Sequence, residues 1–315
     1  ANANGGSIPT TSGWSGSGAS ATKTITFDST YGTLPTPTRT GHTFAGWYTA
    51  ASSGEAVSAS TGVTTTGNRT VYAHWTVNSY TLTADANMTG ATFTSVPSGW
   101  SGSGTTRTRS VTYNTSYGTL PTPAKEGYIF LGWYTASSGG SSVYSSTTMG
   151  AGNTRIYAHW ERTWAADAVD VNLSGLGGSG TTSDPYVIDS PTDIAFLALQ
   201  TSKNVTFDGK YFKQTTNIDL EGKTWLPIGN ATTAFQGSYD GNGYLITNIT
   251  TIANGQLNYS NVGLFGYTRN ATIKNVNIIS GNIQGYDNVG SIVGNLNNGS
   301  VENCRSGATV TGYNY

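Results

Sequence analysis

Two stretches of the chain repeat one another closely. Residues 31–50 read YGTLPTPTRTGHTFAGWYTA, and residues 117–136 read YGTLPTPAKEGYIFLGWYTA. Shorter matches flank both copies: TITFD (24–28) with TRTRSVTYN (106–114), and TVYAHW (70–75) with RIYAHW (155–160). A unit that recurs with its prolines and glycines in register predicts two small domains in tandem, because each copy can close its own core.

The repeated unit has the pattern of β-structure. SYTLTADA (79–86) alternates with period two, and GYIFLGWYT (127–135) is an aromatic strand. The prolines of YGTLPTP (117–123) exclude helix there. Charged residues are only 10% of the chain, so its 19 Tyr and 8 Trp must supply much of the buried area. We expect one β module over residues 1–76, without its first strand, and a second over 77–163.

The paired motifs GHTFAGWYT…VYAHW and GYIFLGWYT…IYAHW resemble the Listeria–Bacteroides repeat, also called the internalin B-repeat. The resemblance covers about residues 20–76 and 106–161. It implies a compact β-grasp-like fold, found in strings in secreted bacterial surface proteins, with no known chemistry. The first copy has His42 where the second has Tyr128, and the SGWSGSG insert makes the period longer than in the shortest family members.

The aromatic residues of the modules are predicted to be core rather than a platform for sugars, since strand aromatics are the main burial available. These core positions are Trp47, Trp75, Trp133 and Trp160. Trp14 and Trp100 lie on Gly-rich loops and are the candidates for exposed aromatic contacts. His74 and His159 hold equivalent positions in separate domains, so they are expected to be half-exposed strand residues and not ligands of a shared metal.

One helix is predicted in the second half, over SPTDIAFLALQTSK (190–203). Ser190 is placed to cap it, Pro191 to open it, and Asp193 lies in the first turn. Strands then dominate. Three of them, LITNIT (245–250), TIKNVN (272–277) and SVENCR (300–305), follow one another at a nearly constant spacing.

Such spacing predicts the coils of a parallel β-helix over residues 164–315, continuing past the chain end, in which like residues stack. The predicted stacked positions are Ile246, Ile273 and Val301; Asn248, Asn275 and Asn303; and Ile249, Val276 and Cys304.

These coils resemble the GLUG motif of bacterial surface proteins. The match is GLFG (263–266), with a looser GSIVG (290–294) that departs at Ser291, after the lead-in KTWLPIGNATTAFQGSYDGNGYLITNI. The resemblance covers about residues 185–312. It implies a right-handed parallel β-helix, found in secreted proteins that include surface peptidases whose catalytic domain lies elsewhere in the chain.

No constellation for catalysis is expected. The candidates are Asp208, Asp219, Asp240 and Lys210, of which Asp219 and Asp240 are better explained as strand-end and turn residues. DGNG (240–243) lacks the ligand spacing of a calcium loop, and no HExxH occurs. The one cysteine, Cys304, is predicted to be buried, unpaired and without metal. We therefore predict no catalytic residue, no metal and no cofactor.

Several function classes are disfavoured by composition. With a net charge of −1 and no basic stripe, nucleic acid is not an expected partner, and no apolar run is long enough to span a membrane. The first hypothesis is a secreted, non-catalytic bacterial cell-surface protein that serves adhesion or surface assembly, with the repeats as a stalk. The alternatives are a self-assembling extracellular filament or sheath subunit, and an accessory region of a surface peptidase or carbohydrate-active enzyme.

The expected partners are a protein or glycan on a cell surface, or copies of the chain itself. ANAN (1–4) begins where the repeat's first strand should have ended, and ATVTGYNY (308–315) stops partway through a coil. We therefore expect either a longer polypeptide or an assembly in which neighbouring subunits cover both edges.

Overall fold

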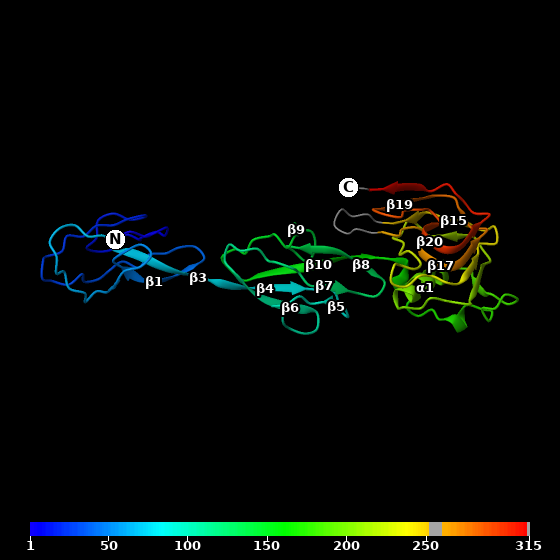
Figure 1. Cartoon of the computed structure of the whole chain (residues 1–315), viewed down its shortest axis with the longest axis horizontal. Helices are drawn as coiled ribbons and strands as arrows, with labels where there is room; N and C mark the ends of the chain where they lie inside the picture. Colours follow the sequence, from blue (N-terminus) through cyan, green and yellow to red (C-terminus); the bar gives the residue numbers. More distant parts are fainter. Residues whose placement is uncertain (252–259, 314–315) are drawn as a thin grey trace. The chain divides into compact units, whose positions relative to one another are not determined.

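The computed structural model describes residues 1–251 and 260–313 (Figure 1). Within these ranges the chain forms 22 strands and one α-helix, so the predicted all-β class with a single helix is confirmed. Two compact units are formed by residues 1–85, 95–121 and 141–157 and by residues 86–94, 122–140 and 158–315. The domain boundaries at residues 76 and 163 follow the sequence repeats and stay a prediction.

The first module contains three strands, β1(His42–Tyr48), β2(Ala56–Val57) and β3(Tyr72–Val77). They form an antiparallel sheet in the order β2-β1-β3, and Trp47 of β1 lies opposite Val57 and Ala73. All three of these side chains are buried, because alternate residues of β1 face the core. The ladder between β1 and β3 shifts register between Phe44 and Gly46, where Gly46 has a φ of 130° that favours glycine.

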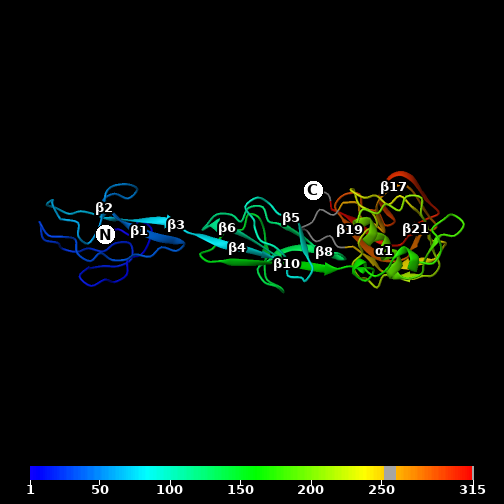
Figure 2. The same cartoon turned by 90° about the horizontal axis from the view of Figure 1, so that it is seen from below.

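The second module has seven strands. They are β4(Ser79–Asp85), β5(Thr92–Ser95), β6(Thr106–Thr112), β7(Thr122–Ala124), β8(Tyr128–Tyr134), β9(Ser142–Val143) and β10(Thr154–Arg162). Five of them form one sheet in the order β6-β4-β10-β8-β9, and β5 pairs with β7. β4 is antiparallel to β6 and parallel to β10, and these three strands lie together in the second view (Figure 2). The β-grasp-like topology stays a prediction.

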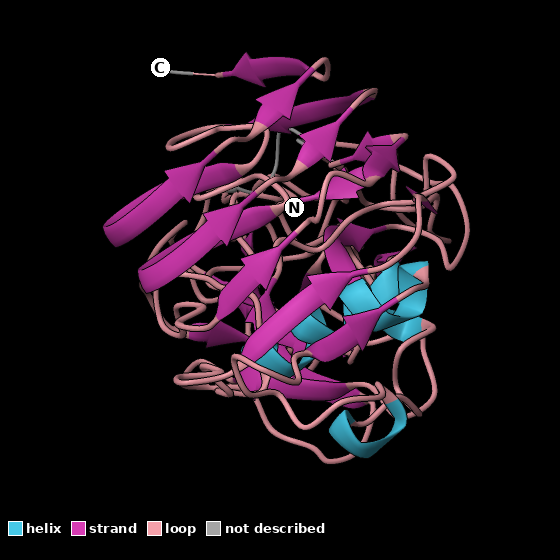
Figure 3. Ribbon diagram, turned by 90° about the vertical axis from the view of Figure 1, so that its right-hand side faces the viewer, coloured by secondary structure: helices cyan, strands magenta, loops and turns pink. Residues whose placement is uncertain are grey.

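The remaining strands stack in parallel. They are β11(Tyr186–Ile188), β12(Tyr211–Gln214), β13(Ile218–Asp219), β14(Ser238–Asp240), β15(Leu245–Thr247), β16(Ile249–Thr250), β17(Phe265–Lys274), β18(Asn277–Ile278), β19(Gly281–Gly285), β20(Val293–Glu302), β21(Arg305–Ser306) and β22(Thr309–Gly312). Their sheets run β11-β12-β14-β17-β20, β13-β15-β18-β21 and β16-β19-β22 (Figure 3). This arrangement is a β-solenoid of about four turns; its predicted right hand stays a prediction.

The predicted helix is α1(Pro191–Ser202), preceded by the 3-10 turns η1(Trp164–Ala166) and η2(Leu173–Gly175). Ser190 Oγ accepts a hydrogen bond from the Asp193 amide at 3.2 Å, as the capping pattern predicts. The helix is buried on more than the expected face, since Ala195, Phe196 and Leu199 are enclosed together with the predicted apolar stripe.

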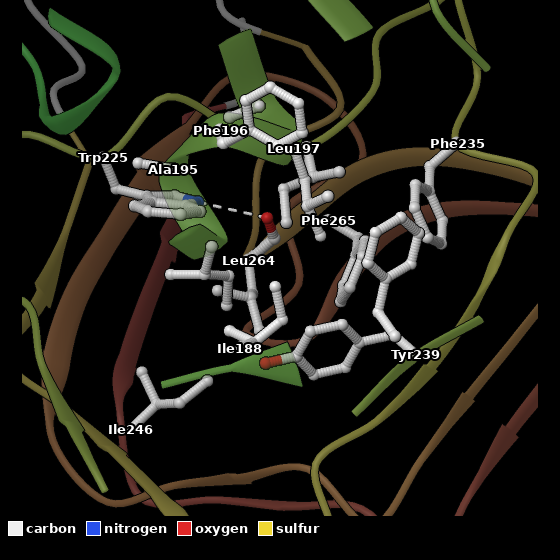
Figure 4. Close-up of a cluster of buried hydrophobic side chains, with 14 of the residues drawn as sticks. Ile188, Ala195, Phe196, Leu197, Trp225, Phe235, Tyr239, Ile246, Leu264 and Phe265 are labelled. Carbon is white, nitrogen blue, oxygen red and sulfur yellow. Dashed lines mark hydrogen bonds between the residues drawn. The ribbon is translucent and has the colours of Figure 1, made fainter. Parts of the chain in front are cut away.

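Aromatic side chains fill the solenoid beside α1. Phe235 lies 5.1 Å and Tyr239 5.4 Å from Phe265, measured between ring centroids. Figure 4 shows this cluster, with the Trp225 indole N–H donating to the Leu264 carbonyl at 3.1 Å. Because these interior side chains are fully buried and closely packed, they hold the strands that carry the outward residues in place.

The predicted stack of apolar residues is correct for two coils and wrong for the third. Ile273 and Val301 are in register, but the residue that precedes them in their column is Tyr239, not Ile246. Ile246 instead pairs with Ile218 and Ile278 in a different sheet. The coil from Tyr239 to Ile273 is longer than the coil from Ile273 to Val301, so the assumption of a constant spacing aligned two different corners.

The asparagine positions explain why residues 245–250 could be aligned with the two later strands. Asn248, Asn275 and Asn303 all have positive φ, between 51° and 58°, although Asn248 belongs to another corner of the coil. Asparagine tolerates this left-handed conformation better than most residues. The same apolar-x-Asn pattern therefore marks a strand end wherever the chain turns, and it does not identify which strand has ended.

Candidate functional site

The most regular surface of the solenoid is the outer side of the sheet β11-β12-β14-β17-β20, called the outer face below. Phe212, Tyr239 and Ile273 point inward from β12, β14 and β17 and are buried. Their neighbours in sequence therefore point outward, since side chains alternate along a strand. Two outward columns result: Tyr211, Ser238, Thr272 and Ser300, and Lys213, Asp240, Lys274 and Glu302.

Charge alternates along the second column, because successive coils contribute a base, an acid, a base and an acid. Lys274 Nζ lies 3.4 Å from the carboxylate of Asp240. The rungs are about 4.8 Å apart, so each charge has an opposite neighbour and the column is close to neutral. The outer face can therefore offer many hydrogen-bonding groups without a strong field of one sign.

Asp240 is held in its charged form. Burial raises the pKa of this carboxyl, but the Asn275 side-chain amide and the Asn242 backbone amide, each at 2.8 Å, and Lys274 together lower the pKa below its ordinary value. A carboxylate tied by three donors is poorly suited to give or take a proton near neutral pH. Its geometry is that of a residue that fixes a strand end.

An aromatic residue, Tyr267, lies near the start of β17, whereas Lys274 lies at its end. Asn297 Nδ2 donates to the Tyr267 hydroxyl at 2.8 Å, and the Arg269 guanidinium lies 6.0 Å from the ring centroid. The hydrogen bond from Asn297, and next that from Arg269, lower the pKa of Tyr267. The outer face itself combines hydroxyls and paired charges, which are groups that contact sugars or polar protein surfaces.

The outer face was missed at the level of sequence, although it has a sequence signal. The triplets YFK (211–213), SYD (238–240), TIK (272–274) and SVE (300–302) each place one apolar or aromatic residue between a neutral and a charged one. The interval between the second and third triplets is longer than the other two, so a search for one fixed period does not find them.

The loop tryptophans differ from their prediction as exposed contacts. Trp100 is only 8% exposed, so it is corrected to a buried residue. Its indole N–H donates to the Thr119 carbonyl at 2.9 Å, which folds the Gly-rich loop onto the module. Trp14 makes the same bond to Thr33 but is half-buried, with Lys23 Nζ 5.9 Å from its ring.

The four strand tryptophans are all at least half-buried. Trp47 and Trp133 are buried, whereas Trp75 and Trp160 are half-buried. The latter two bind backbone in the same way in both modules, through indole N–H bonds to the carbonyls of Ala3 and Ala86.

The two histidines also repeat. Each ring stacks on a tyrosine, Tyr48 for His74 and Tyr134 for His159, with centroids 3.9 Å apart. Each Nε2 lies 2.9 Å from a backbone carbonyl. A ring held between a tyrosine and a carbonyl is a structural residue, and it has no acidic or nucleophilic partner in these contacts.

Cys304 continues the column below Val276 but is half-buried, so its predicted full enclosure is corrected. Burial raises the pKa of this thiol, which disfavours the nucleophilic thiolate. Val301, three residues before Cys304, is also 39% exposed.

The carboxylates singled out in the sequence do not converge. Asp208 is exposed, Lys210 is half-buried nearby, and Asp219 ends β13, where it accepts bonds from the Glu221 amide and Asn248. Over residues 1–251 and 260–313, no group of three His, Cys, Asp or Glu side chains is arranged to hold a metal ion. No helix in those ranges is long and apolar enough to cross a membrane.

Comparison with known proteins concerns mainly the modules. The model of the Listeria-Bacteroides repeat domain matches residues 2–74 and 80–159. Internalin H of Listeria monocytogenes is 32% identical over 145 residues, which cover 46% of this chain and 24% of that protein. Halomucin of Haloquadratum walsbyi is 28% identical over 155 residues, covering 45% of this chain and 2% of that protein.

The chain therefore spans at most 24% of the length of these curated relatives. No solved structure matches it. The predicted resemblance of the two modules to Listeria–Bacteroides repeats is confirmed, whereas the likeness of the solenoid to GLUG-motif proteins stays a prediction.

Proposed function

We propose that this chain acts outside the cell as a non-catalytic bacterial surface protein, in which the two repeat modules form a stalk and the solenoid makes adhesive contacts. The similarity of the modules to internalin H and to halomucin supports a place at the cell surface. The observation that carries the adhesive role is the outer face, with its two columns of outward polar residues on a rigid stack of parallel strands.

The chemistry of the outer face favours a polar ligand of low charge. Its acids and bases alternate, so attraction of a strongly charged partner is not its main contribution. Hydroxyls such as those of Ser238 and Thr272 repeat along the stack at the spacing of the strands. A glycan, or a protein surface rich in hydroxyl and amide groups, would satisfy several of these groups at once.

The direct test is binding of the full chain to arrays of surface glycans and extracellular proteins. Thr272→Arg places a large cation in the middle of the outer face, and we expect it to weaken binding at least about tenfold. The matched control is Thr247→Arg on β15, which is also half-buried but belongs to another sheet, and it should bind like the parent chain.

Equal loss in both variants, or no ligand on any array, would contradict the adhesive role. Fibres that form with increasing concentration would favour the filament hypothesis. Turnover of a polysaccharide or peptide that is abolished by Asp240→Asn would contradict the non-catalytic assignment.

A further inference from the structure

Each module is joined to the next part of the chain by a single residue. Asn78 separates β3 from β4, and Thr163 separates β10 from η1. Both stand three residues after a matching tryptophan, Trp75 in the first module and Trp160 in the second. A connection of one residue can act as a hinge or can be fixed on both sides, and its hydrogen bonds decide between the two cases.

The first connection is bonded to both of its neighbours. The Asn78 amide donates to the Gly41 carbonyl at 2.9 Å in the first module, and the Asn78 carbonyl accepts from the Tyr113 amide at 2.8 Å in the second. The Asn78 side chain is held as well, because its Oδ1 accepts a hydrogen bond from the Thr43 hydroxyl at 2.6 Å. Both backbone groups of Asn78 are therefore satisfied by the modules that it joins.

The second connection is bonded in the same way. The Thr163 amide and hydroxyl both donate to the Gly127 carbonyl, at 3.1 Å and 2.8 Å. On the solenoid side, Thr163 pairs in parallel with Thr224, and the Trp164 amide donates to the Thr224 carbonyl at 3.2 Å. Trp164 then enters the solenoid core, where its indole N–H donates to the Leu220 carbonyl at 2.8 Å.

Gly41 and Gly127, called the docking glycines below, occupy the same place in the two modules, directly before β1 and β8. Their φ angles are 71° and 75°, in the region that favours glycine. The following part of the chain covers each bare α-carbon: the ring of Tyr113 lies against Gly41, and the backbone of Ala166 lies against Gly127. A methyl group at either position would overlap those atoms, so close approach is a second reason for glycine.

The parts that dock are unlike each other, although the surface that receives them is the same. Tyr113 follows β6 of a β module and adds an edge-to-face contact with His42, with ring centroids 5.8 Å apart. Ala166 belongs to the 3-10 turn η1, and an ion pair of 2.6 Å between Glu126 and Lys203 of α1 lies across the same connection. The shared elements are the carbonyl and the α-carbon of the docking glycine, which are backbone groups and select no particular side chain.

We infer that the docking glycine and the residue after the last strand form, at the end of each module, a docking surface for whichever domain follows in the chain, so that the connection is fixed and is not a hinge. Domains in one chain move relative to one another unless their contact restrains them. Here the connecting residue is bonded on both sides, and the following part packs directly on the glycine. The inference rests on the proposed stalk for its biological use, since a stalk that presents an adhesive solenoid needs stiff connections.

The test measures distances between spin labels in the full chain by double electron–electron resonance, in a Cys304→Ser background. Labels are attached to cysteines that replace exposed residues. One pair, at Ser53 and Ser103, spans the first connection, and the other, at Ser138 and Thr182, spans the second. In the parent chain, each pair should show a single narrow distance.

The docking glycines should affect the two connections separately. Gly41→Ala should abolish the single distance of the first pair and leave the second pair unchanged, and Gly127→Ala should do the reverse. The matched controls are Gly18→Ala and Gly139→Ala, whose φ angles are 76° and 64° but where, among the described residues, a methyl group meets no neighbour. These controls carry the same backbone strain, and both of their distances should stay narrow.

Two further variants leave the docking glycines intact and decide the question if a glycine variant unfolds its module. Tyr113→Ala and Thr163→Val should each widen the distance distribution across their own connection, while hydrogen exchange in the strands stays as in the parent chain.

Three results would overturn the inference. The first is a broad distribution for either pair in the parent chain. The second is equal broadening in the Gly18→Ala and Gly139→Ala controls, which would assign the effect to backbone strain. The third is unchanged narrow distances in the Gly41→Ala and Gly127→Ala variants. The arrays measure ligand binding and the labels measure geometry, so failure of the adhesive role and failure of the fixed connections are distinguishable.

Discussion

The two modules share the same side-chain hydrogen bonds to backbone carbonyls. Trp75 and Trp160 donate equivalent bonds, and so do Asn4 and Asn87. Asn4 and Asn87 have φ of 49° and 54°, and each donates its side-chain amide to two carbonyls distant in sequence. All of these bonds have ordinary hydrogen-bond lengths, from 2.8 Å to 3.1 Å. The sheets of the two modules differ: β4 lies within a five-stranded sheet in the second module, whereas Asn2 makes isolated bridges to Ser20 and Tyr72 in the first.

That difference separates what local sequence determines from what the sheet determines. Ile25 and Val111 stand in matching segments, TITFD and SVTYN, yet Val111 is buried and Ile25 is not. The turns and side-chain caps form in both modules because they depend on nearby residues. Burial of the segment depends on a strand that comes from outside it.

The largest difference between the modules is expected when a carboxylate is introduced at matching positions in both. Val111→Asp should destabilise the second module by several kcal/mol, because it buries an unpaired carboxylate. Ile25→Asp should cost less than about 1 kcal/mol in the first module, where water reaches the side chain. Urea unfolding followed by hydrogen exchange in each module measures both values, and similar costs would remove the distinction between the modules.

A second test uses the loop tryptophans. Trp100→Ala should cost about 3 kcal/mol, since it removes a buried indole and its bond to the Thr119 carbonyl. Trp14→Ala removes an equivalent bond to Thr33 from a half-buried ring, and we expect roughly half that cost. Thermal unfolding of the two variants measures both costs. A larger loss for Trp14 would show that its contact with Lys23 matters more than burial.

The third test concerns the asparagine hydrogen bonds that the two modules share. Asn4→Ala and Asn87→Ala should each cost about 1–3 kcal/mol in urea unfolding, because each leaves two carbonyls without their donor. The two costs should agree within about 0.5 kcal/mol. The control is Asn→Gly at each position, which keeps the left-handed backbone and isolates the hydrogen bonds. Unequal costs would mean that the shared contacts contribute differently in the two modules.

The smallest expected effect concerns a surface charge pair. Arg155 Nη1 lies 2.7 Å from Asp85 Oδ2 across β10 and β4, with both side chains partly exposed. Arg155→Ala should cost no more than about 0.5–1 kcal/mol, and this cost should shrink in high salt. The matching positions in the first module are Thr70 and Asn2, so Thr70→Ala should show no such salt dependence.

Much of the fold follows from signals that act over a few residues. The period-two strands around Trp47 and Trp133 and the Ser190 cap of α1 are of this kind, and sequence alone places them well. The solenoid column failed at Ile246 because coil length varies, and only the completed ladder shows which corner each Asn occupies. Trp100 was misjudged because its burial depends on a loop that folds back over it.

The candidate site was harder to foresee than the fold. The outward residues Thr272 and Lys274 are ordinary in their own strand, and they form a surface only when four coils are in register. The partial burial of Ile25 and Val63 could not be predicted either, since exposure depends on how the rest of the module closes.

A single residue, Asn78, separates β3 from β4, so the closing strand of one module leads directly into the central strand of the next (Figure 1). Backbone hydrogen bonds lie perpendicular to the strands in the antiparallel pair of β4 and β6, and they cross at a slant in the parallel pair of β4 and β10. A pull along β4 would therefore load its bonds to β6 and β10 together instead of breaking them one after another. A chain anchored at one end and held by a ligand at the other would resist stretching at this strand.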